Sequence, residues 1–169
     1  MNKDDEPVLD AGVPGQGGQE SIPLVERIRG LVTSQPYGVL ATHGDGHAYG
    51  SLVAFAFSED LRRAYFATPT ATRKYRLLTE HDRIALVVDD RPDHAGQMME
   101  VEAVTVTGSA REVPQGPGRE AGTAELLARH PQLRSFLAAD SCAVFEIEVF
   151  RYLHVSRFQE VRQWVPGNP

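Results

Sequence analysis

An Asp-Gly pair between two β-rich segments constrains the fold of this chain more than any other feature of the sequence. The two segments are residues 37–42 and 48–57, and Gly44-Asp45-Gly46 lies between them. Glycine supplies the positive φ that the tight turn of a β-hairpin requires. The sequence therefore predicts that these two segments pair as antiparallel neighbours.

Further β-rich segments follow, separated by turns or short helical segments. We predict the later strands at residues 64–68, 83–89, 99–108, 142–149 and 152–158, the last pair antiparallel to each other. Residues 109–113 continue the strand 99–108 after a bend. We predict helices at residues 21–34, 71–80, 119–129 and 131–138. Thr70 is the expected N-cap of the second helix.

Strands that are joined mostly by hairpins favour an antiparallel barrel over a sheet of alternating strands and helices. In residues 48–57, Leu52 and Ala56 share one face and Val53 and Phe55 share the other. Because both faces are apolar, we expect a strand that is buried inside the barrel and covered outside it. The predicted fold class is mostly β, a six- to seven-stranded antiparallel barrel with short helices.

Composition bounds the domain organisation. A chain of 169 residues with 41% hydrophobic residues is long enough for one buried core, which we assign to residues 21–165. Residues 1–20 combine acidic residues with two prolines and four glycines, and we predict a disordered tail there. The single cysteine, Cys142, cannot form an internal disulfide or a cysteine-based zinc site. No metal site is predicted.

The charge of the chain argues against two classes of partner. The formal net charge is −6 and no run of lysine or arginine occurs, so the overall field repels nucleic acid and anionic membranes. No segment approaches the roughly 20 apolar residues that span a bilayer, and the acidic start is unlike a signal peptide. We expect a cytoplasmic protein whose anion site, if it has one, is local.

The segment from Tyr65 to Tyr75 carries the strongest chemical signal. A strand ends near Ala67 and Thr68, and Thr72-Arg73-Lys74 then opens the predicted helix. Free N–H groups at a helix start, a hydroxyl and two cations form a suitable cradle for a phosphate. The alternative is that Thr70 only caps the helix while both cations are solvated, and spacing alone does not decide between the two.

The order of segments along residues 36–164 resembles the pyridoxamine 5'-phosphate oxidase-like split barrels. These segments are 38–42, 50–55, the Thr72-Arg73-Lys74 segment, 104–108 and 152–158. The resemblance implies that Thr72, Arg73 and Lys74 hold the phosphate of FMN at the interface of a homodimer. It also implies flavin contacts, largely from the main chain, for the following residues: Ser51, Leu52, Val53, Ala54, Ala67 and Thr68. Arg157 and Trp164 are candidates to cover an edge of the ring, because arginine and aromatic groups stack on planar rings.

The sequence departs from the true pyridoxamine phosphate oxidases in two respects. Their extended substrate-binding residues are not evident. A glutamine of that family is not evident, and Ala103 stands near its position. Pyridoxal phosphate synthesis is therefore not expected. We expect an FMN-dependent oxidoreductase that acts on an unidentified small molecule, with no catalytic side chain assigned. The alternatives are a non-catalytic flavin reservoir, a redox sensor or a haem-handling protein, for which His154 would matter more, and use of deazaflavin in place of FMN.

Overall fold

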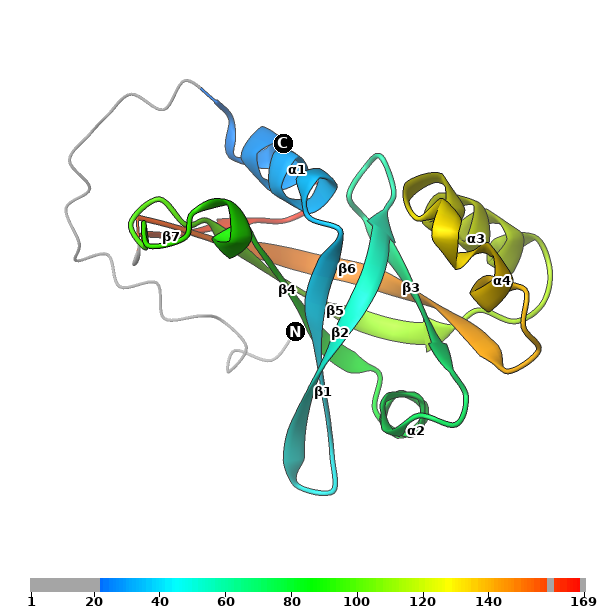
Figure 1. Ribbon diagram of the computed structural model, residues 1–169. Coiled ribbons are helices and arrows are strands. Elements are labelled where there is room, and N and C mark those ends of the chain that lie inside the picture. Colours follow the sequence, from blue (N-terminus) through cyan, green and yellow to red (C-terminus); the bar gives the residue numbers. More distant parts are fainter. Residues whose placement is uncertain (1–21, 158–159, 168–169) are drawn as a thin grey trace.

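Within the residues that the computed structural model describes, 22–157 and 160–167, six antiparallel strands close into a barrel. The strand order is β3-β2-β1-β4-β5-β6, pairing of β3 with β6 closes the ring, and β7 adds to the free edge of β6 (Figure 1). The strands are β1 (Tyr37–Gly44), β2 (His47–Phe57), β3 (Arg63–Pro69), β4 (Arg83–Asp89), β5 (Ala103–Glu112), β6 (Cys142–Ser156) and β7 (Glu160–Trp164). The predicted fold class is confirmed. The predicted tail at residues 1–20 lies outside the described residues.

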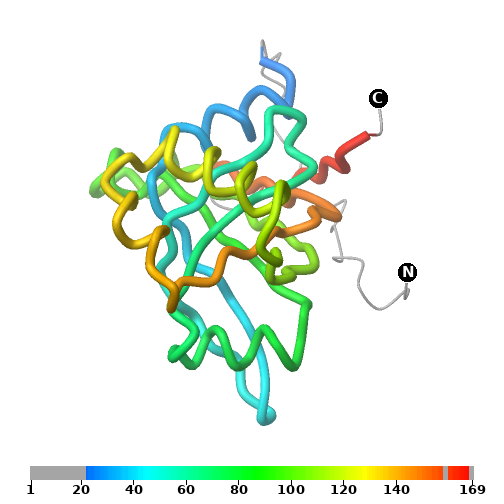
Figure 2. Tube along the Cα trace, turned by 90° about the vertical axis from the view of Figure 1, so that its right-hand side faces the viewer, coloured from blue at the N-terminus to red at the C-terminus, as the bar shows by residue number. Residues whose placement is uncertain are grey.

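Short helices occupy the junctions between strands. They are α1 (Leu24–Ser34), α2 (Arg73–Glu80), α3 (Pro117–Arg129) and α4 (Arg134–Leu137), with 3-10 turns η2 (Arg91–Asp93) and η3 (Pro131–Leu133). Figure 1 shows α1 at one end of the barrel and α2 at the other, and Figure 2, turned by 90°, shows the same separation. No helix among the described residues combines the length and the apolar character needed to cross a membrane.

The hairpin predicted from the Asp-Gly pair is confirmed. The register of β1 and β2 runs from Tyr37 opposite Ala54 to Gly44 opposite His47, which leaves a two-residue turn. Asp45 and Gly46 both have positive φ, 53° and 76°, as the favoured two-residue hairpin turn requires. This turn therefore fixes the register of every residue that β2 presents.

The barrel interior is filled by alternate strand residues and by one face of α1. Ile28, Leu40, Phe55, Phe66, Leu86, Val106 and Phe145 belong to this cluster. The outer face of β2 is covered over only part of its length, which corrects the prediction for this strand. Ala56 is buried in a second cluster with Leu126 of α3, whereas Leu52 is 67% exposed because no described element packs over it.

The prediction of two strands at 142–149 and 152–158 is wrong. Residues 142–156 form the single strand β6, and the strand that returns antiparallel to it is β7, which lies beyond the predicted strands. The buried side of β6 changes phase from Val149 to Tyr152, where the register with β5 shifts between Thr107 and Gly108. A β-bulge thus produced the break in alternation that was interpreted as a turn.

Two further boundaries differ from the sequence prediction. Strand β5 begins at Ala103 and not at residue 99, because residues 98–100 form a turn after η2. The N–H of Glu102 donates to the Asp90 carboxylate at 2.8 Å and fixes the point where the strand begins. The predicted continuation over residues 109–113 is confirmed as far as Glu112.

We predict opposite effects of alanine at two glycines. At Gly108 a Cβ would lie 2.4 Å from the main-chain oxygen of Glu148, so Gly108→Ala is expected to lower the free energy of unfolding by about 1 to 3 kcal/mol. At Gly30 in α1 a Cβ meets nothing within 4 Å, so Gly30→Ala is expected to raise it by about 1 kcal/mol. Urea denaturation measures both, and equal stabilities of the two variants would contradict the bulge geometry.

Candidate functional site

Strand β2 pairs with β3 only over its last three residues and diverges from it before them. Pairing between them covers only residues 55–57 with 64–66, whereas β1 pairs with β2 along almost its whole length. Figure 1 shows the β1–β2 hairpin diverging from β3 beyond this point. In the part of the chain that the structure describes, no strand pairs with the second edge of residues 51–54. The main-chain groups on that edge are therefore available to another partner.

The side chains of residues 51–54 alternate between the two faces of β2. Val53 is buried in the barrel, and Ser51 lies on the same side of the strand. The Ser51 hydroxyl is buried and has no hydrogen-bond partner among the described residues. A buried polar atom without a partner is uncommon in folded proteins and requires an explanation. Leu52 points to the opposite, exposed side.

Helix α2 begins where β3 ends. Strand β3 stays paired with β6 through Thr68 and Pro69, and the Thr70 N–H then donates to the Ser141 carbonyl at 2.8 Å. The N-cap is Thr72 and not Thr70, which corrects the prediction for this helix. This bond extends the pairing of β3 with β6 by one residue, and the helix begins two residues later than predicted.

The Thr72 hydroxyl is fully engaged within the chain. It accepts from the Tyr75 N–H at 3.2 Å, donates to the Pro69 carbonyl at 2.9 Å and lies 2.9 Å from the hydroxyl of buried Thr68. This arrangement satisfies one of the N–H groups that a helix start leaves unpaired. Thr72 and Thr68 therefore shape the start of α2, and the N–H groups of Arg73 and Lys74 still point out of the helix.

Two cations in the first turn of α2 have no counter-charge among the described residues. Arg73 is exposed and its guanidinium carbon lies 5.1 Å from the centre of the Tyr49 ring. Burial lowers the pKa of half-buried Lys74 below its ordinary value. Neither has a carboxylate partner among the described residues, whereas Arg76 of the same helix pairs with Asp45 at 3.2 Å and with Glu80 at 3.7 Å. Because cations oppose the helix dipole here, an anion would stabilise this end of α2.

The residues predicted from the sequence thus fall into two groups. Residues 51–54, Ala67, Thr68, Thr72, Arg73 and Lys74 all lie on the parting strands or at the start of α2. Arg157 and Trp164 lie elsewhere in this chain. Arg157 is exposed between β6 and β7 and pairs with Glu160 at 3.3 Å, and the Trp164 ring packs 5.4 Å from that of Tyr152. Figure 1 shows β7 beside α1, at the other end of the barrel from α2.

Sequence reasoning did not single out Tyr49. It lies on β2, before the residues that pair with β3, and its ring is the partner of Arg73. Nothing in the local pattern marks it, because the contact joins residues on different elements. Only the divergence of β2 from β3 brings the two side chains together.

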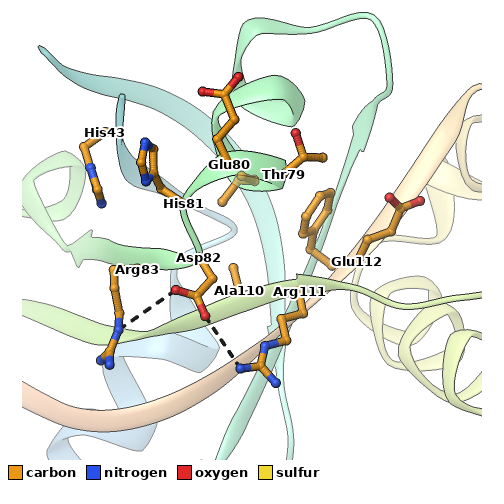
Figure 3. Close-up of a pocket in the computed structure, with 11 residues that line it drawn as sticks. His43, Thr79, Glu80, His81, Asp82, Arg83, Ala110, Arg111 and Glu112 are labelled. Carbon is orange, nitrogen blue, oxygen red and sulfur yellow. Dashed lines mark ion pairs between the residues drawn. The ribbon is translucent and has the colours of Figure 1, made fainter. Parts of the chain in front are cut away.

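A second polar region lies at the far end of α2, in a pocket of about 470 Å³ (Figure 3). The rings of His43 and His81 stack there with centres 4.7 Å apart. Asp82 accepts from the Ser109 hydroxyl at 2.7 Å, which holds the pKa of its carboxyl below the ordinary value. Arg111 lies 3.6 Å from the same carboxylate. The described residues contain no cluster suited to a metal ion.

Comparison with known proteins relates this chain to one family and to one reductase. A family model described as pyridoxamine 5'-phosphate oxidase matches residues 24–155. A 5a,11a-dehydrotetracycline/5a,11a-dehydrooxytetracycline reductase from Streptomyces rimosus is 32% identical over 102 residues, which are 59% of this chain and 70% of that protein. The matched family segment includes β2, β3 and α2, the elements that carry the candidate site.

Solved structures show the same fold at low identity. A heme-binding protein from Mycobacterium smegmatis aligns with a TM-score of 0.76 and 18% identity, over 86% of this chain. This chain spans 59% of the length of that protein. The heme storage protein HutZ from Vibrio cholerae has a TM-score of 0.66 and 15% identity, over 86% of this chain and 96% of that protein. A FAD-binding protein from Mesorhizobium loti has a TM-score of 0.62 and 18% identity, over 79% of this chain and 94% of that protein.

We predict that the two threonines before α2 respond differently to substitution. Thr72→Ala removes the cap of α2 and is expected to lower the free energy of unfolding by about 1 kcal/mol. Thr70→Ala is the matched control and is expected to change it by less than about 0.5 kcal/mol, because only its main chain is bonded. Urea denaturation distinguishes them, and a larger loss in Thr70→Ala would contradict the assignment of the cap.

Proposed function

Since the chain belongs to the pyridoxamine 5'-phosphate oxidase family, we propose that it is a flavin-dependent oxidoreductase that holds FMN between β2 and the start of α2. The observation that carries the proposal is the pair Arg73 and Lys74, two cations at a helix start without carboxylate partners among the described residues. The substrate in this proposal is a small molecule. The proposal includes a cytoplasmic location.

The phosphate fits the start of α2 for an electrostatic reason. A phosphate dianion would compensate the partly desolvated ammonium of Lys74, accept a forked pair of bonds from Arg73 and interact favourably with the helix dipole. Charge-assisted bonds of this kind contribute about 1.5 to 3 kcal/mol each. Thr72 then acts by fixing the helix start, since its own hydroxyl is already bonded within the chain.

The isoalloxazine fits the unpaired edge of residues 51–54. The ring carries several hydrogen-bonding nitrogen and oxygen atoms along one edge, and the strand offers unpaired main-chain groups together with the buried Ser51 hydroxyl. When bound, FMN supplies hydride transfer at its N5 atom. The chain supplies the orientation of the ring and the neutralisation of the phosphate. Because the cofactor would supply the hydride transfer, the proposal requires no side chain as a general acid or base.

We propose further that two copies enclose the flavin. On the outer face of the sheet, a groove of about 600 Å³ includes Tyr37, Val39, Leu52 and Val87, and Leu52 is also one of the residues proposed to contact the ring. An exposed apolar surface next to a proposed cofactor site suits an interface between protomers. Arg157 and Trp164 lie away from the proposed site within one chain, so their proposed contact with the ring would come from the partner protomer.

The likeness to heme proteins makes haem binding the second candidate. Two of the similar structures are named for heme. His154 is not well placed to serve such a ligand, because it is fully buried and its Nε2 lies 2.8 Å from the Glu102 carboxylate. The reductase from Streptomyces rimosus favours redox chemistry on a small molecule instead. Titrating the purified protein with FMN, deazaflavin and haem in parallel separates these alternatives.

We predict that FMN binding depends on the start of α2. Arg73→Ala with Lys74→Ala is expected to weaken FMN binding by about 3 kcal/mol, roughly a hundredfold, and to leave riboflavin binding unchanged. Arg76→Ala with Arg83→Ala removes the same charge from outside the proposed site and is the matched control. Flavin fluorescence quenching gives both dissociation constants.

The outcomes of this experiment separate the competing explanations. Equal weakening of FMN in both double variants would indicate a general charge effect and contradict a phosphate site at α2. Failure of the unmodified protein to take up FMN, together with a Soret band on adding haem, would replace the flavin proposal with the haem alternative.

We predict that the unmodified protein is a dimer in solution and that Leu52→Asp makes it monomeric. A charge on this exposed side chain would be buried without a partner in the proposed interface. Asp60→Asn, in the β2–β3 turn outside the groove, is the control and is expected to stay dimeric. Sedimentation velocity measures the state, and a dimer that survives Leu52→Asp would place the interface elsewhere.

A further inference from the structure

Arg73 lies against an aromatic ring, whereas Arg76 of the same helix is paired with carboxylates. Its guanidinium carbon lies 5.1 Å from the centre of the Tyr49 ring, within the range of a cation–π interaction. Arg76, one turn further along α2, is bound instead by Asp45 and Glu80. Two neighbouring arginines on one helix therefore have partners of opposite character.

The choice of partner determines what Arg73 can still do. A carboxylate would neutralise the guanidinium, occupy its N–H donors and repel an approaching phosphate. A ring attracts the cation through its face and leaves the N–H donors of the guanidinium edge unoccupied. Tyr49 can thus fix the position of Arg73 without reducing its capacity to bind an anion.

The main chain of Tyr49 is held in the hairpin. It pairs with Thr42 in the hairpin register, and the hydroxyl of buried Thr42 donates to the Tyr49 carbonyl at 3.2 Å. The ring therefore bridges from the diverging part of β2 to the first residue of α2. A second bridge, Asp45 to Arg76, joins the same hairpin to the same helix but is exposed on both sides. It offers a control that breaks a hairpin–helix contact without touching Arg73.

We propose that Tyr49 is a positioning residue for phosphate recognition. Its ring holds the Arg73 guanidinium toward the phosphate and so increases the preference of the site for FMN over riboflavin. This inference rests on the proposed function and adds to it the residue that orders the phosphate-binding arginine. Tyr49 acts through Arg73, and the proposal assigns it no contact with the reacting atoms.

The experiment compares Tyr49→Ala, Tyr49→Phe and Asp45→Asn by their dissociation constants for FMN and for riboflavin. Tyr49→Ala is expected to weaken FMN binding roughly three- to tenfold while riboflavin binding stays within about twofold. Tyr49→Phe keeps the ring and is expected to retain the preference of the unmodified protein. Asp45→Asn is expected to retain it as well, because Arg76 does not face the phosphate in this proposal.

Several results would overturn the inference. An unchanged FMN-to-riboflavin ratio in Tyr49→Ala, or an equal loss for both ligands, would show that the ring has only a structural role or none. Loss of the preference in Asp45→Asn would show that any break between the hairpin and α2 has the same effect. If the unmodified protein itself binds both flavins equally, the proposed phosphate site fails first, and the inference fails with it.

Discussion

The parting of β2 from β3 after three paired residues is the constraint on which the candidate site depends. Up to this point β2 is an ordinary barrel strand, with Phe55 opposite Phe66 and both rings in the core. Beyond it, β2 follows β1 alone while β3 follows β6 toward Pro69. One strand edge is thereby left unpaired in the described part of the chain, and α2 begins beside it. If β2 and β3 were paired along their whole length, these main-chain groups would be hydrogen-bonded within the barrel and the candidate site would be closed.

The electrostatic character of the site follows from which charges are left uncompensated. The chain has more acidic than basic residues, yet Arg73 and Lys74 have no acidic partner among the described residues. Because burial lowers the pKa of Lys74, the folded chain is destabilised while this ammonium is charged, and the effect disappears as the pH rises above the ordinary pKa of lysine. Because half-buried Lys74 does not stabilise the fold, its position is better explained by binding of an anionic ligand.

Local signals in the sequence were sufficient for most of the fold, and they selected residues that the structure places at the start of α2. The Asp-Gly turn fixed the hairpin, and the Thr72-Arg73-Lys74 run located the phosphate-binding candidate. The bulge opposite Gly108 could not be distinguished from a turn, because both interrupt the alternation of β6 in the same way. The cap at Thr72 and the contact of Tyr49 with Arg73 depend on main-chain and side-chain partners from other elements, which a linear pattern does not contain.

The hydroxyls of Thr68 and Thr72 order the start of α2 through contacts within the chain. They bond to each other and to the start of α2, so they fix the direction of the first N–H groups of the helix. The ring of Tyr49 on β2 contacts the Arg73 guanidinium. Groups that are already ordered lose little conformational entropy on binding. The desolvation of Lys74 is also incurred on folding, so the binding of a phosphate would not have to incur that cost again.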